Sequence, residues 1–252
     1  MPSDPPKEPL VKIRGLKTVL GGHMVHKNVN LDIYAGESFV LLGPSGTGKS
    51  VLLKEIIGLL RPTAGEIWFD GKEISHFSER EYLGIRRQAS MLFQGAALFD
   101  SFSVFDNVAF PLREQGLAKE EDLPKIVAEK LSLVGLPGIE KKMPAELSGG
   151  MKKRVALARA IATEPRMILY DEPSTGLDPT NTRRINELIR SLQKKIGVTS
   201  LIVTHELSTV FEATDRAALL WEGEIVAVGP PEELRVSGPL LVRQFLEGTA
   251  PL

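Results

Sequence analysis

The chain of 252 residues lacks cysteine altogether, which excludes disulfide bonds, thiolate metal sites and cysteine nucleophiles. It also lacks an excess of charge of either sign, because 31 Lys and Arg residues face 32 Asp and Glu residues. The resulting net charge of −1 provides no basic surface for nucleic acid, so we expect no nucleic-acid partner. No apolar run approaches the roughly 20 residues that cross a bilayer as a helix, so work at a membrane would require a partner protein.

Residues 1–9 are rich in proline and polar side chains and lack the apolar core of a signal peptide, so we interpret them as a disordered lead. No internal repeat occurs at a fixed period, which argues against two tandem copies of one domain. The length is enough for one large α/β domain with a small insertion.

Three short apolar runs show no alternation of polar and apolar residues, which is typical of strands covered on both faces of a parallel sheet. They are Ser38–Leu42, Met167–Tyr170 and Ser200–Thr204. Ligands of open α/β sheets bind beyond the carboxyl ends of the strands. Each run is followed there by polar or glycine residues, namely Gly43-Pro44-Ser45, Asp171-Glu172 and His205-Glu206. We therefore expect these residues to lie at one edge of the sheet.

Other runs predict further strands and helices. Short strands are expected at Val11–Ile13 and Val29–Ile33, on either side of a turn at Gly21-Gly22. Apolar residues recur at helical spacing in four segments, Lys49–Leu60, Asp122–Val134, Met151–Ala162 and Asn181–Lys195. No buried strand is apparent between residues 95 and 162, so this part of the chain is predicted to be a helical insertion.

The strongest motif is the phosphate loop Gly43-Pro44-Ser45-Gly46-Thr47-Gly48-Lys49-Ser50, which fits G-x-x-x-x-G-K-S/T. Its glycines let backbone N–H groups turn toward phosphates, and the helix that follows presents its positive end to them. Lys49 is expected to reach the β- and γ-phosphates, and the Ser50 hydroxyl is expected to bind Mg²⁺. This pattern predicts a nucleoside triphosphate site.

Two adjacent carboxylates, Asp171 and Glu172, end a predicted buried strand. In a phosphate-loop enzyme an acid at this place holds Mg²⁺, which is the role expected of Asp171. Glu172 can then polarise a water for in-line attack on the γ-phosphate. Taken alone, the pair could equally cap the turn before Pro173, and the phosphate loop favours the catalytic interpretation.

A second segment suits a phosphate without containing a lysine of its own. In Leu147-Ser148-Gly149-Gly150-Met151, Ser148 can cap the following helix and the glycines allow close backbone approach to an anion. The pattern by itself favours an ordinary capped helix.

The order and spacing of these segments resemble the nucleotide-binding subunits of ABC transporters over about residues 10–247. The resemblance rests on the phosphate loop, Gln94, the segment Leu147–Met151, Asp171-Glu172, Ser174-Thr175-Gly176-Leu177-Asp178 and His205. It implies an α/β fold of the P-loop NTPase (RecA-like) type with a mostly parallel sheet, an antiparallel β subdomain and a helical insertion. The expected parts are an α/β core (about 10–93 and 163–230), a helical subdomain (about 94–162) and a C-terminal helical tail (231–248).

The resemblance also implies roles for site residues. Two copies of the chain would sandwich two ATP molecules, so that Ser148, Gly149 and Gly150 bind the nucleotide of the opposite subunit. Gln94 would sense Mg²⁺ and the attacking water, Asp178 would lie at the dimer interface, and His205 would contact the γ-phosphate. The alternative for His205 is an ordinary surface histidine after a strand.

One position departs from the family pattern. Most such subunits place an aromatic residue before the early glycine turn to stack on adenine, whereas this chain has Leu20. A leucine can cover a base but cannot stack on it, which predicts weaker or less selective base recognition.

Three stretches look like the ATPases of the Mla and Mce lipid-transport systems, namely Gln94–Ser101, Asn107–Glu114 and Arg243–Gly248. This finer resemblance implies a membrane permease as partner, a lipid-binding substrate protein of the same system, and a place on the cytoplasmic side of the cell membrane. Leu98, Phe99, Phe102 and Phe105 would suit a groove for a helix of the permease, or else they pack within the insertion's own core. The C-terminal stretch would either close the domain or, as in that family, help to hold the dimer.

Three other functions stay open at this point. A transport ATPase for another solute would have the same motifs, because cargo contacts lie on other chains. A soluble ABC protein of translation or DNA maintenance usually has tandem domains or a long coiled coil, and neither is apparent in this sequence. A non-catalytic binding module is disfavoured by the presence of Lys49, Asp171, Glu172 and His205.

Overall fold

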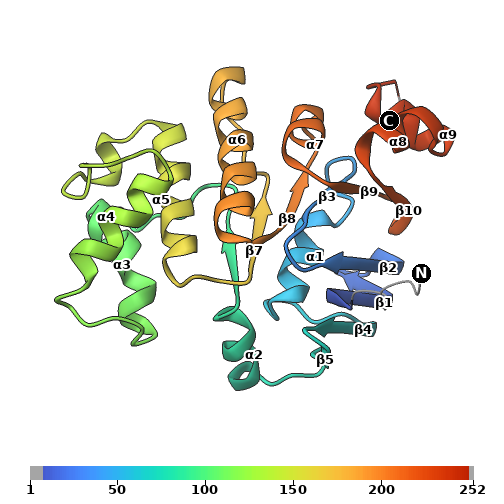
Figure 1. Cartoon of the computed structure of the whole chain (residues 1–252). Helices are drawn as coiled ribbons and strands as arrows, with labels where there is room; N and C mark the ends of the chain where they lie inside the picture. Colours follow the sequence, from blue (N-terminus) through green and yellow to red (C-terminus); the bar gives the residue numbers. More distant parts are fainter. Residues whose placement is uncertain (1–7, 250–252) are drawn as a thin grey trace, which may run out of the picture.

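The computed structural model describes residues 8–249, which form a curved sheet with helices packed against it (Figure 1). The strands are β1 (Pro9–Leu20), β2 (His23–Tyr34), β3 (Ser38–Leu42), β4 (Ala64–Phe69), β5 (Lys72–Glu73), β6 (Ala89–Leu92), β7 (Met167–Asp171), β8 (Thr199–Thr204), β9 (Arg216–Trp221) and β10 (Glu224–Gly229). The helices are α1 (Lys49–Ile56), α2 (Glu79–Arg86), α3 (Val104–Glu114), α4 (Leu123–Leu133), the 3-10 turn η1 (Pro144–Glu146), α5 (Gly149–Ala162), α6 (Pro179–Ile196), α7 (Leu207–Ala213), α8 (Pro231–Ser237) and α9 (Leu240–Leu246). No helix within residues 8–249 is long and apolar enough to cross a membrane.

The sheet has a parallel part and an antiparallel part, in the overall order β5-β4-β1-β2-β10-β9-β3-β8-β7-β6. Strand β3 pairs in parallel with β8 and β9, and β7 pairs in parallel with β6 and β8. Strands β1, β2, β4 and β5 pair antiparallel. The two parts meet where Glu224 of β10 pairs with Asn28 of β2. The predicted fold class, a mostly parallel core with an antiparallel subdomain, is confirmed.

The central strands are buried on both faces, as their unbroken apolar sequences predict. In β3, Val40 and Leu42 belong to a core cluster that also contains residues of α5, α6 and α7. Phe39 and Leu41 point to the opposite side, into a cluster that contains α1 and the antiparallel strands. Helix α1 therefore lies between the two parts of the sheet, and its first turn is held at the carboxyl end of β3 (Figure 1).

Between Gln94 and Thr163 the structure contains helices and turns but no strand. Helices α3, α4 and α5 pack together and lie on the opposite side of the central strands from β1 and β2 (Figure 1). The subdomain boundaries expected from the sequence stay a prediction. At the C-terminal end, Val242 and Leu246 of α9 are buried in the main core, so this helix packs on its own chain.

Several predicted boundaries were wrong. The hairpin strands β1 and β2 extend over 12 residues each, well beyond the expected Val11–Ile13 and Val29–Ile33. Residues 1–7 of the expected lead lie outside the described residues, but Pro9 already belongs to β1. Helix α1 ends at Ile56 because Gly58 takes a left-handed φ of 68°, and a Cβ there would lie 2.4 Å from the Tyr82 ring. Helices α5 and α6 begin two residues earlier than expected, at Gly149 and Pro179.

A buried polar cluster joins the hairpin to α1 and the phosphate loop. His26 and Glu55 are fully buried, with Nδ1 of His26 lying 3.2 Å from Oε2 of Glu55. The Thr18 hydroxyl donates to Oε1 of Glu55 at 2.5 Å. Nε2 of His26 lies 3.1 Å from the carbonyl oxygen of Gly48, so both ring nitrogens face oxygen acceptors. The pair thus holds α1 against β2 beneath the phosphate loop.

We predict that His26→Leu lowers the free energy of unfolding by about 1–3 kcal/mol, because it removes the ring nitrogen that faces the buried Glu55 carboxyl group and leaves that group without its partner. The double variant His26→Leu/Glu55→Leu should lose less stability than the two single variants added together, since it removes both polar groups and leaves neither one buried without a partner. Urea unfolding of the four proteins measures the cycle. Strictly additive losses would show that the two side chains do not act as a pair.

Candidate functional site

The phosphate loop connects β3 to α1, and two of its glycines fit where a side chain would not. Gly43 has a φ of 155°, and a Cβ there would lie 2.4 Å from the carbonyl oxygen of Leu220. Gly48 has a φ of 98°, and a Cβ there would lie 2.5 Å from Val25. Because α1 begins at Lys49, the loop places the unpaired N–H groups of a helix N-terminus at its centre.

Lys49 is almost completely buried at this loop. Its ammonium donates to the carbonyl oxygens of Gly43 and Pro44, both at 2.8 Å. Burial lowers the pKa of Lys49, and the nearby charges of Glu172 and Asp171 oppose that decrease. The lysine is therefore held across the loop by groups that a phosphate can replace.

Two side-chain oxygens that could bind a metal ion meet beside the loop. The Ser50 hydroxyl donates a hydrogen bond to Oδ1 of Asp171 at 2.5 Å. Asp171 ends β7 and is 8% exposed. Within residues 8–249 no cluster of three or more His, Asp or Glu side chains suits a metal ion. An ion at Ser50 and Asp171 would thus need further oxygens from a ligand or water, which is how Mg²⁺ is usually bound.

Glu172 follows directly and has a left-handed φ of 49°, which is uncommon for any residue but glycine. Its Oε1 lies 3.0 Å from Nδ1 of His205, and the Thr175 hydroxyl lies 3.4 Å from its Oε2. The Glu172 side chain is 13% exposed and that of His205 47% exposed. A carboxylate paired with a histidine is thereby placed at the mouth of the loop.

Lys49, Ser50, Glu172 and His205 line one cavity of about 330 Å³. Its lining consists of Val25, Ser45, Gly46, Gly48, Lys49, Ser50, Val51, Gln94, Glu172 and His205, eight of which are among the sixteen predicted site residues. The predicted residues Gly43, Pro44, Thr47 and Asp171 belong to the same region but do not line the cavity. Val25 and Val51 were not predicted, since nothing in their local sequence marks them. Leu20, expected at the adenine position, is not among the lining residues, and neither is any aromatic side chain.

The remaining predicted residues lie elsewhere in the same chain. Ser148 caps α5 by accepting from the Met151 N–H at 3.3 Å, and Asp178 caps α6 by accepting from Asn181 at 3.0 Å. The two caps are neighbours, because a Cβ on Gly150 would lie 3.2 Å from the Asn181 side chain. None of Ser148, Gly149, Gly150 and Asp178 lines the cavity. One chain therefore holds the two halves of the predicted site apart.

A second hollow, of about 520 Å³, is mostly apolar and is lined by residues on both sides of Gln94 in the chain. Its lining includes Phe93, Ala97, Phe99, Phe110 and Arg159. Of the four residues predicted for such a groove, only Phe99 lines it, with 41% of its surface exposed. Leu98 and Phe105 pack against the main core, as the alternative interpretation held.

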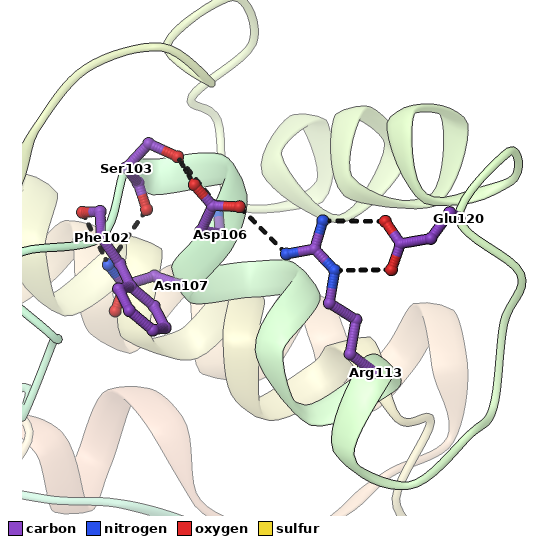
Figure 2. A network of polar contacts seen from close by, with 6 residues as sticks. All are labelled: Phe102, Ser103, Asp106, Asn107, Arg113 and Glu120. Carbon is purple, nitrogen blue, oxygen red and sulfur yellow. Dashed lines mark hydrogen bonds and ion pairs between the residues drawn. The ribbon is translucent and has the colours of Figure 1, made fainter.

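Phe102, the fourth of these residues, packs against Phe99 and Phe110 with tilted rings whose centroids lie 5.0 and 6.0 Å away. Buried Asn107 holds this segment to α3 by donating to the carbonyl oxygens of Phe99, Phe102 and Ser103. Figure 2 shows the last two of these bonds beside Arg113, which bridges Asp106 and Glu120. The groove wall is therefore a firmly held structure.

Comparison with known proteins places these features in a family. A family model described as "ABC transporter" matches residues 26–175. The chain is 48% identical over 238 residues to the "Probable ribonucleotide transport ATP-binding protein mkl" of Mycobacterium leprae, covering 94% of this chain and 69% of that protein. It is 44% identical over 239 residues to the "Intermembrane phospholipid transport system ATP-binding protein MlaF" of Haemophilus influenzae, covering 95% of this chain and 90% of that protein.

A solved structure agrees with the sequence comparisons. The ATP-binding cassette MJ0796, in a dimeric post-hydrolysis state bound to ADP and Pi, superposes with a TM-score of 0.78 at 33% identity. The match covers 87% of this chain and 98% of the cassette. The chain therefore belongs to the ABC transporter family, as one of its ATP-binding, ATP-hydrolysing subunits.

Proposed function

We propose that the chain hydrolyses ATP to drive transport of phospholipids or other hydrophobic molecules through a separate membrane permease. The observation that carries the ATPase part is the single cavity in which the phosphate loop faces Gln94, Glu172 and His205. ABC membership supports the coupling to a transporter.

In this proposal the loop N–H groups and Lys49 bind the phosphates, with Lys49 exchanging the carbonyls of Gly43 and Pro44 for phosphate oxygens. Ser50, Asp171 and Gln94 are the residues proposed for Mg²⁺, which when bound neutralises charge on the β- and γ-phosphates. Their oxygen atoms fit that ion, as the Ser50–Asp171 contact indicates.

Glu172 is the proposed general base. It accepts a proton from a water as that water attacks the γ-phosphorus, and the bond from the γ-phosphorus to the bridging oxygen of ADP breaks. His205 stands 3.0 Å from the same carboxylate and is proposed to orient it and to contact the γ-phosphate. Because the pair lines the cavity beside Lys49, water and phosphate can meet both groups at once.

The site is proposed to be completed by a second copy of the chain. Ser148, Gly149, Gly150 and Asp178 lie outside the cavity of their own chain, so we assign them to the nucleotide bound by the partner. The dimeric form of MJ0796 with ADP and Pi supports this arrangement. ATP would close the dimer, and hydrolysis would reopen it.

The permease is proposed to bind the groove lined by Phe93, Phe99 and Phe110. Such an apolar hollow suits the apolar face of a helix, and Gln94 directly follows Phe93 in the chain. Through the permease the chain would lie at the cytoplasmic side of the cell membrane, and a lipid-binding substrate protein would complete the system.

The names of the two relatives give different cargoes. MlaF is a phospholipid transport protein, whereas mkl is named for ribonucleotides. We favour lipid because the stretches Gln94–Ser101, Asn107–Glu114 and Arg243–Gly248 resemble lipid-transport ATPases and because MlaF matches over 90% of its length. Transport of a ribonucleotide is the second candidate, supported by the name of mkl.

Glu172→Gln should retain ATP binding and lower kcat by about 100-fold or more, because it removes the base and keeps the Mg²⁺ residues. An ATP-bound dimer should accumulate, visible by size-exclusion chromatography.

Lys49→Ala should instead weaken ATP binding by about tenfold or more through loss of a charge-assisted contact. Lys54→Ala, at the far end of α1, is the matched control. Wild-type turnover in Glu172→Gln would remove Glu172 from its role.

Phe99→Asp should prevent copurification of the membrane permease while leaving ATP affinity within about twofold, because it places a charge in the apolar groove and not in the nucleotide cavity. Leu117→Asp is the control, since Leu117 is an exposed apolar residue of the same helical region outside the groove. Retention of the permease by Phe99→Asp would contradict the docking site.

Cargo is tested on the intact complex of this chain with its permease. We expect mass spectrometry to find phospholipid in the purified complex, and added phospholipid to raise its ATPase rate. A rise in rate with ribonucleotides, without bound phospholipid, would replace lipid by the second candidate and leave the ATPase proposal intact.

A further inference from the structure

Helix α5 carries a lysine that points into the protein. Lys153 is 7% exposed, and its ammonium donates to the carbonyl oxygens of Pro173 at 2.8 Å and Thr175 at 2.6 Å. Both acceptors belong to the segment 173–178, which connects Glu172 to Asp178. The lysine therefore joins the helix that Ser148 caps to the backbone that follows the proposed general base.

A buried ammonium is costly, so its contacts have to compensate for lost hydration. Burial lowers the pKa of Lys153, and the charge of Glu172 opposes that decrease. The two carbonyls supply the hydrogen bonds, and Glu172 supplies the nearby opposite charge. A leucine at this position would have filled a helix interface at lower cost, which points to a role beyond packing.

The backbone next to these carbonyls needs support. Glu172 adopts a φ of 49°, in a region that costs a residue with a side chain about 1 kcal/mol or more. Such conformations persist where the surroundings hold them from several sides. Here the Glu172 N–H donates to Val203, the Thr175 N–H donates to the Glu172 carbonyl, and Lys153 holds the next carbonyls.

The same segment and the first turn of α6 lie close to the start of α5. A Cβ on Gly149 would lie 3.9 Å from Leu177, and one on Gly150 would lie 3.2 Å from Asn181, whose amide donates to Asp178. The segment thus lies beside the first turn of α5 and is hydrogen-bonded to the helix at Lys153.

On the basis of the proposed function, we propose that Lys153 is a positioning residue for Glu172: through the Pro173 and Thr175 carbonyls it keeps this carboxylate in place for attack on the γ-phosphate. Ser148, which caps the same helix, is assigned to the partner's nucleotide. Lys153 thereby links that half of the site with Glu172, the proposed base for the chain's own nucleotide.

The test compares Lys153→Met with Lys153→Arg, in which a guanidinium can still donate to both carbonyls. In the full-length protein, Lys153→Met should lower kcat by about 10–100-fold, as displaced supporting groups commonly do. The Kd for ATP should stay within about twofold, because Lys153 does not line the cavity. Lys153→Arg should recover a large part of the lost turnover. Lys152→Met, which removes the same charge from the neighbouring position, should keep wild-type kcat.

A double variant separates positioning from a general structural defect. If Lys153 acts through Glu172, adding Lys153→Met to Glu172→Gln should leave the residual rate of phosphate release unchanged within about twofold. Thermal unfolding checks that each variant is folded, and Lys153→Gln, which retains one donor, replaces Lys153→Met if that variant does not fold.

A kcat of Lys153→Met within about twofold of wild type would overturn the inference, as would a further tenfold loss in the double variant. If Glu172→Gln itself keeps wild-type turnover, that result contradicts the role of Glu172 in the proposed function, whatever Lys153→Met shows. If Glu172→Gln is inactive and Lys153→Met is not, only the role of Lys153 falls.

Discussion

The site depends on how β8 pairs with its two neighbours. Leu42 of β3 lies opposite Thr204, and Asp171 of β7 lies opposite Val203. Because all three strands run in parallel, the residues that follow them emerge together: Gly43, Glu172 and His205. The Glu172 N–H continues the ladder by donating to the Val203 carbonyl at 3.0 Å. A shift of one residue in either pairing would turn these side chains to the other face of the sheet and separate base, histidine and phosphate loop.

Several residues just after the parallel strands have a left-handed backbone conformation. Besides Glu172, Ala96 and Ala97 have φ values of 65° and 47° shortly after Gln94. At both positions an alanine thus adopts a conformation that glycine adopts without strain. Arg159 supports it by donating to the carbonyl oxygens of Ala96 at 3.0 Å and Ala97 at 2.8 Å. Strain beside the cavity is thus offset by cations from α5.

The sequence predicted the site best where polar residues directly follow an unbroken apolar strand. The runs Ser38–Leu42 and Met167–Tyr170 predicted buried parallel strands, and their polar followers were correctly expected at one edge. The length of β1 and β2 was not predictable, because these strands are bulged and half exposed and lack a clear alternation. Of the two alternatives left open for the groove residues, Phe99 lines the groove and Leu98 and Phe105 pack on the core, while Phe102 does not line the groove. The sequence could not decide between them, because an apolar side chain suits a core and a groove wall equally. The only sequence signal for Lys153 was a lysine placed just before the apolar residues of α5, which does not show that its side chain is buried.

Helix α5 connects features that are distant in sequence. Its N-terminus presents Ser148 and Gly150, Lys153 holds the segment after Glu172, and Arg159 holds the segment after Gln94. Arg159 also lies 5.7 Å from the Phe99 ring, which lines the groove assigned to the permease. Ten residues of helix span about 15 Å, so one helix carries the half-site proposed for a partner's nucleotide, contacts the segment that follows Glu172 and lies against the groove. Because packed helices shift as units and not by continuous deformation, a shift of α5 would be expected to affect all three places together.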